Sequence, residues 1–234
     1  SAVPVEKETE VNQPTGKPTL EPRPFHYTDR TGTIVGTMTN DGSEIRVDLD
    51  GWKFVGKVFD ELEPVQPADL PDRFHLDHGF LMDCDFEFTI PVLMNDQSQL
   101  TPFNLLVHFS GEKPDEKDEL DCDAFKVALD YGPHRIVSSG KSGYMEKELL
   151  EIQKQLPDGI FIQSCINCMY SDYSPYGNRL FGDMMCFRNL KQEYLQVKSK
   201  QEFFHIHDHF ERQVQETWLC DEFELRVPGT GYRG

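Results

Sequence analysis

The chain has 234 residues, 38% of them hydrophobic, so it can bury a sizeable core without disulfides or a metal to hold it together. Its formal net charge of −18 argues against nucleic acid or an anionic membrane surface as a partner and favours a basic protein. No apolar run could cross a membrane and no secretory leader is visible, so we expect a cytoplasmic protein.

The negative charge is unevenly distributed along the chain. Residues 1–140 hold 27 acidic and 12 basic side chains, a net charge of −15, whereas residues 141–234 hold 14 and 11, a net charge of −3. Charge of this kind either keeps a protein soluble or attracts a basic partner. An acidic docking surface is therefore expected in the first part of the chain.

Residues 1–24 are polar and contain five prolines, with few large apolar side chains. Such a segment cannot bury enough apolar surface to offset the entropy lost on ordering. We predict a disordered or surface-draped arm, with order beginning near Phe25.

Residues 25–140 carry the alternation of apolar and polar side chains that is typical of strands with one buried face. A β-meander is predicted from Gly32 to Phe59, with turns at residues 40–42 and 50–51. Further strands are predicted at residues 82–90 and 103–109. Residues 125–131 and 134–137 are expected to form a hairpin. This first part is thus an acidic antiparallel sheet or sandwich.

Residues 141–234 mix helical and strand patterns. One helix is predicted from Ser142 to Leu156, and a second from Ser199, which opens a capping box, to about Arg212. Strands are expected at residues 160–165, 184–187, 194–197 and 218–227. The fold class is α+β, with an α+β C-terminal unit of two helices that is either a separate domain or packed as one globule with the first part.

Four cysteines of this C-terminal unit have spacing suited to a tetrahedral metal. Cys165 and Cys168 form a CxxC pair, and Cys186 and Cys220 can supply two more sulfur ligands to a structural zinc. Reduced, buried core cysteines are the alternative, because cysteine is among the most buried residue types. A redox pair is a third possibility. A cytosolic chain with six cysteines is not expected to hold a disulfide framework.

Three tyrosines, Tyr170, Tyr173 and Tyr176, surround the Ser174-Pro175 turn. Their rings either lock this loop or contact a partner. The string HIHDH at residues 205–209 lacks one residue of the HxHxDH pattern of metallo-β-lactamase-like hydrolases, and the preceding capping box favours a helix there. A metal site at these histidines is not predicted.

A partner-binding surface is predicted from the tyrosines and from two acidic groups. One group is the ladder Asp83, Asp85 and Glu87 on the wet face of a strand. The other is the loop 112–123, which holds seven acidic residues. The predicted contact residues of that loop are Asp115, Glu116, Asp118 and Glu119.

The sequences CINCMYSDYSPYGN, FGDMMCFRNLKQEYLQVKSK, VQETWLCDEFE and the terminal GTGYRG resemble an uncharacterised bacterial family of unknown function. The resemblance covers about the C-terminal third of the chain. It implies a bacterial protein with the four cysteines as signature positions, and it implies no reaction.

These observations leave open functions of different classes. The first is an acidic binding module, in particular an immunity or antitoxin-type protein that neutralises a basic toxin enzyme, because charge complementarity speeds capture. The second is a zinc-dependent enzyme that uses cysteine and histidine ligands. The third is a non-catalytic scaffold subunit. We find no phosphate-binding loop, nucleophile elbow or HExxH motif, which favours the first.

Overall fold

The computed structural model describes residues 21–96, 99–111 and 125–233. Its helices are α1 (Met145–Gln155), α2 (Lys191–Gln196) and α3 (Lys200–Phe204). Its strands are β1 (Arg23–Asp29), β2 (Gly32–Asn40), β3 (Ile45–Leu49), β4 (Trp52–Gly56), β5 (Glu63–Pro64), β6 (His75–Asp77), β7 (Phe80–Met82), β8 (Cys84–Asp96), β9 (Gln99–Gly111), β10 (Phe125–Tyr131), β11 (His134–Val137), β12 (Ile160–Ile162), β13 (Ser171–Asp172), β14 (Met184–Cys186) and β15 (Arg212–Val214).

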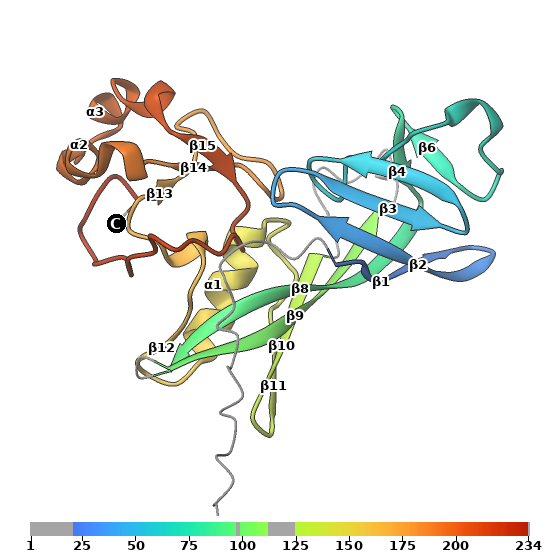
Figure 1. Ribbon diagram of the computed structural model, residues 1–234, viewed down its shortest axis with the longest axis horizontal. Coiled ribbons are helices and arrows are strands. Elements are labelled where there is room, and N and C mark those ends of the chain that lie inside the picture. Colours follow the sequence, from blue (N-terminus) through green and yellow to red (C-terminus); the bar gives the residue numbers. More distant parts are fainter. Residues whose placement is uncertain (1–20, 97–98, 112–124, 234) are drawn as a thin grey trace, which may run out of the picture.

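Two antiparallel meanders form one large sheet in the order β11-β10-β9-β8-β1-β2-β3-β4-β5. The first strand of each meander joins them, because β1 pairs with β8 in a register that places Phe25 beside Phe88 and Tyr27 beside Phe86. The hairpin of β8 and β9 is paired along 13 residues on each strand, and its far end carries β12. Figure 1 shows this hairpin extending away from β3 and β4 toward β12.

The main core lies on one face of this sheet and is rich in phenylalanine. Phe59, fully buried, has its ring centroid 5.3 to 5.5 Å from those of Phe88, Phe109, Phe125 and Phe181. The apolar stripe of α1 packs into the same core. The alternation of apolar and polar residues along the strands places the aromatic rings on one face of the sheet, where they pack against α1.

A second lobe contains the three-stranded sheet β13-β14-β15 with α2 and α3 beside it. Its core is separate from the main one. The rings of Phe187 and Tyr194 stack with centroids 5.0 Å apart, and Phe203 packs against both. This lobe lies across from the β3-β4 end of the large sheet (Figure 1).

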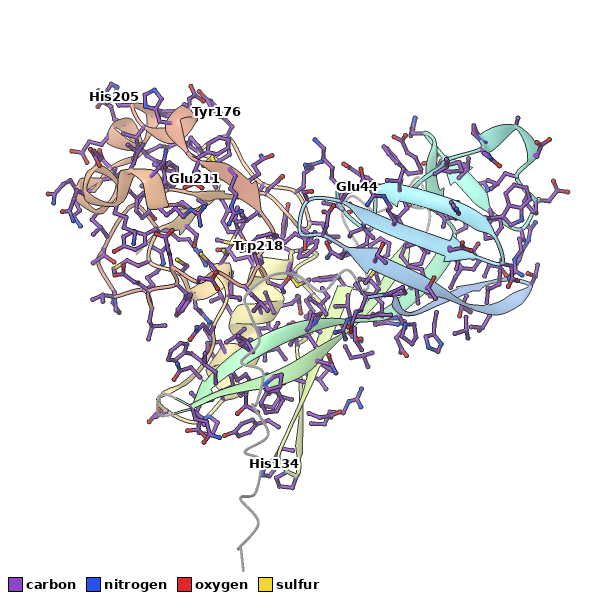
Figure 2. The ribbon with its side chains drawn as sticks, viewed as in Figure 1. Glu44, His134, Tyr176, His205, Glu211 and Trp218 are labelled. Atoms are coloured by element: carbon purple, nitrogen blue, oxygen red, sulfur yellow. The ribbon has the colours of Figure 1, made fainter. Side chains whose placement is uncertain are left out.

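The large sheet with α1 forms the first lobe. It contacts the second lobe through polar side chains and through one close contact with a ring. The side-chain amides of Asn40 and Gln215 exchange two hydrogen bonds, of 2.8 and 3.0 Å. Gly42 lies against the ring of Trp218 so closely that an added Cβ would fall 1.8 Å from a ring carbon. Figure 2 shows Trp218 at the centre of the molecule, between the two lobes.

The α+β class and the mainly antiparallel first part are confirmed. The meander of β2, β3 and β4, the hairpin of β10 and β11, and the Ser199 capping box are all present as predicted. Most of the arm predicted for residues 1–24 lies outside the described residues. Within the part of the chain that the structure describes, no helix is long and apolar enough to cross a membrane.

Four elements of residues 141–234 differ from prediction. Residues 194–197 are not a strand, since Tyr194 belongs to α2. The predicted C-terminal unit, residues 141–234, therefore has three helices rather than two. The second predicted helix ends at Phe204, whose carbonyl is hydrogen bonded to His207 Nδ1 at 3.0 Å. The strand predicted for 218–227 is reduced to an isolated bridge between Cys168 and Leu225. The strand predicted for 160–165 ends at Ile162, because a 3-10 turn begins at Cys165.

Candidate functional site

The four predicted metal ligands, here called the cysteine cluster (Cys165, Cys168, Cys186 and Cys220), come together in the second lobe. A 3-10 turn joins the first two, with the Cys168 N–H donating to the Cys165 carbonyl at 3.1 Å. Cys186 ends β14 and is paired with Ser171 of β13, three residues after Cys168. The local backbone therefore brings three of the four cysteines to one place.

Cys220 is held near the other three by contacts on both sides of it. The Cys165 N–H donates to the carbonyl of Trp218 at 3.1 Å, and Cys168 forms its bridge with Leu225. Every pair within the cluster is close enough for electrostatic interaction between the thiols. The five described cysteines, which include Cys84 outside the cluster, are free thiols.

Burial dominates the chemistry of these sulfurs. Cys165, Cys168 and Cys186 are almost fully buried, and loss of hydration raises the pKa of each thiol because the thiolate is the charged form. Backbone N–H groups oppose this shift: Tyr170 and Glu224 donate to the Cys168 sulfur, and Arg188 donates to the Cys186 sulfur.

Three arginines surround the cluster. The Arg188 side chain forms a hydrogen bond with Cys220, and it also pairs with Glu211. Arg212 lowers the pKa of Cys165, and Arg226 lowers that of Cys168. The Arg226 guanidinium also donates to the Cys168 carbonyl at 2.9 Å. Cationic side chains therefore lie beside the cluster, although Arg188 is itself paired with Glu211 and Glu222.

The tyrosine loop is partly internal. Tyr170 is buried, with its hydroxyl donating to Glu224 at 2.8 Å and Lys191 over its ring, and Tyr173 is buried with its hydroxyl donating to Glu216 at 3.1 Å. Tyr176 is 76% exposed and lies against Phe204 at the top of the second lobe (Figure 2). Of the three tyrosines, Tyr176 is the one placed to contact a partner.

Two carboxyl groups near the junction, the buried Glu216 and the half-buried Asp60, were not predicted. Glu216 is fully buried, and burial raises its pKa to about 7 although the Gly182 N–H donates to it at 2.8 Å. Burial likewise raises the pKa of Asp60 to about 6. The sequence holds 41 acidic residues, so nothing in the pattern distinguishes these two from the exposed ones.

Acidic side chains concentrate in residues 60–87, here called the acidic segment, which contains nine acidic residues and one basic residue. The basic residue, Arg73, pairs with the buried carboxylate of Asp29 at 3.0 Å and lies over the Tyr27 ring. Exposed acids remain along the segment: Glu63, Asp69, Asp72, Asp83 and Glu87. The segment includes β6, which lies at the end of the molecule opposite the second lobe (Figure 1).

The predicted acidic ladder lies on the outer face of the large sheet. Glu87 is exposed between His26 of β1 and His108 of β9, and Asp85 is half-buried. Asp83 precedes β8 rather than lying on its face, and its carboxylate is 3.3 Å from His75 Nε2. The loop acids Asp115, Glu116, Asp118 and Glu119 lie outside the described residues.

The HIHDH histidines do not share a strand face, because His207 to His209 form a 3-10 turn after α3. Among residues 21–96, 99–111 and 125–233, no three His, Cys, Asp or Glu side chains are arranged as they stand to hold a metal ion. The cysteine cluster is thus a group of neighbouring thiols rather than a formed coordination sphere.

The fold and these sites define an acidic α+β protein built on a large antiparallel sheet. The chain belongs to a family of unknown function, DUF6304, whose model matches residues 21–171. No curated protein and no solved structure matches the chain. The family match covers the large sheet and α1 and ends at β13, so the C-terminal signature and a bacterial origin remain predictions.

Proposed function

We propose that this chain is a protein-binding module that captures a basic protein through the acidic segment. The observation that supports this most strongly is the balance of nine acidic residues to one basic residue, with that base, Arg73, paired with Asp29 rather than with the acids of the segment. A field of one sign raises the rate of encounter with a partner of the opposite sign.

The narrower form of the proposal is an immunity or antitoxin-type protein of bacterial origin, with a basic toxin enzyme as its partner. The net charge of −18 and the absence from the sequence of a recognisable catalytic motif support it. A zinc-dependent enzyme is less favoured, because a fourth cysteine beside the other three would occupy the position that a catalytic zinc keeps open.

The test uses the purified products of adjacent genes, each titrated against the full chain at low and high salt. Binding of a basic product that weakens as salt rises is expected, and polylysine of similar length gives the level of nonspecific attraction. No binding by any basic product, or binding equal to that of polylysine, would refute the proposal.

A matched pair of variants locates the surface. Glu63→Gln, Asp69→Asn and Asp72→Asn together remove three exposed charges of the acidic segment. The control removes three exposed charges elsewhere, by Asp158→Asn, Glu193→Gln and Asp208→Asn. The first set is expected to slow association at least several-fold more than the control, since steering depends on where the charge lies. Equal effects would show that net charge alone matters.

A further inference from the structure

The cysteine cluster has a backbone built to hold it. The 3-10 turn at Cys165–Asn167, the pairing of β13 with β14, and the two contacts on either side of Cys220 each place one cysteine beside the others. These contacts join segments separated by as many as 57 positions along the chain, from Cys168 to Leu225. Random burial of cysteines in a core does not require their backbones to be fixed in this way.

Polar groups lie beside the buried sulfurs. Backbone N–H groups donate to the sulfurs of Cys168 and Cys186, and the Arg188 side chain donates to Cys220. Thiolates, rather than thiols, bind metals. Polar groups beside the sulfurs can thus stabilise thiolates that a bound cation keeps deprotonated.

We propose that the cysteine cluster is a structural zinc site in which all four sulfurs bind one Zn²⁺. Binding converts four thiols to thiolates and releases their four protons to solvent, so the site gains one dication and loses four protons. The resulting centre carries a charge of −2. Arg212 lies near Cys165 and Arg226 near Cys168, so these two cations can offset part of that charge. Soft thiolate ligands in tetrahedral number select zinc over hard cations.

Binding of zinc requires the four sulfurs to move closer together. The four sulfurs do not yet surround a common point. Rotation of a cysteine from one χ1 well to the next moves its sulfur by about 3 Å. Rotamer changes can therefore supply part of the movement that brings the sulfurs together. The bound metal would hold the β13-β14 pair, the 3-10 turn and the Cys220 loop together.

The direct experiment is elemental analysis of the full chain, purified under reducing conditions without added metal. About one zinc per chain is expected, and X-ray absorption should report sulfur neighbours at about 2.3 Å. Wild-type protein with no zinc, and with no uptake of added Zn²⁺, would overturn the proposal. So would iron in place of zinc, nitrogen or oxygen neighbours, or a native Cys165–Cys168 disulfide found by mass spectrometry.

Variants identify the ligands. Cys186→Ser is expected to lose most of the zinc, whereas Cys84→Ser, a change at another buried cysteine outside the cluster, should keep it. Full zinc content in Cys186→Ser would contradict the assignment. If Cys186→Ser does not fold, the wild-type protein decides: chelation should lower its melting temperature, zinc should restore it, and Co²⁺ in place of zinc should give thiolate-to-metal absorption. Chelation without effect on a zinc-containing protein would contradict a structural role.

Discussion

Glu216 provides a pH-dependent contribution to stability whose sign can be worked out. Its pKa rises from the ordinary 4.5 to about 7 because the side chain is fully buried. The folded protein therefore binds a proton more tightly than the unfolded chain does. The resulting stabilisation is fully present below pH 4.5 and is lost as pH rises through about 7.

The perturbation is Glu216→Gln, which removes the charge and keeps the size of the side chain. Its single oxygen can accept from Gly182 or from Tyr173 but not from both, a loss that is the same at every pH. A shift from 4.5 to about 7 corresponds to at most about 3 kcal/mol. The variant should therefore gain up to about 3 kcal/mol over wild type between pH 5 and pH 8.

The assay is urea unfolding of both proteins at pH 5, 6, 7 and 8, with the difference in unfolding free energy plotted against pH. Taking the difference cancels the other carboxyl groups, including Asp60. Glu193→Gln, at an exposed position, is the control and should give a flat difference. A flat difference for Glu216→Gln as well would refute the reasoning, because it would mean that the buried carboxyl titrates as it does in water.

Three further predictions concern packing, capping and the tyrosine loop. Phe59→Ala should cost about 3–5 kcal/mol of unfolding free energy, whereas Val35→Ala, at an exposed position, should stay within about 0.5 kcal/mol; urea unfolding measures both. Ser199→Ala removes the capping box of α3 and should cost about 1 kcal/mol by the same measurement. Tyr170→Phe removes the hydrogen bond to Glu224 and should lower the unfolding free energy by about 1 kcal/mol. Tyr176→Ala, at an exposed position, should leave the unfolding free energy nearly unchanged. Equal effects of the two tyrosine changes would contradict their different burial.

The meander of β2, β3 and β4 could be predicted because the alternation of apolar residues and the positions of the turn residues indicate the same strand boundaries. Ile45, Val47 and Leu49 point inward between two glycine-containing turns, and Asp50 and Gly51 both adopt the positive φ that the second turn requires. The pairing of β1 with β8 could not be predicted from the sequence. It joins strands far apart in the chain and depends on how the aromatic rings of the two meanders pack against one another.

The second lobe was harder to predict because its elements are short. Tyr194 and Val197 are buried three positions apart, a spacing that a window of four residues cannot assign to helix or strand. The CxxC spacing predicted a group of cysteines, but the arginines beside them come from separate segments, and no spacing rule connects those segments. Sequence spacing can therefore predict that ligands close in sequence lie together, but it does not predict which residues from other segments surround them.

The junction between the lobes has a consequence for how the chain can be divided. The family match ends at residue 171, yet the Phe59 ring packs against Phe181, and Glu61 forms an ion pair with Arg179 at 2.8 Å. A fragment cut at that limit would expose part of an aromatic core to water and leave Asn40 without the Gln215 amide. The residues that match the family are therefore fewer than the residues that pack together in the fold. Protein for experiments should include the whole second lobe.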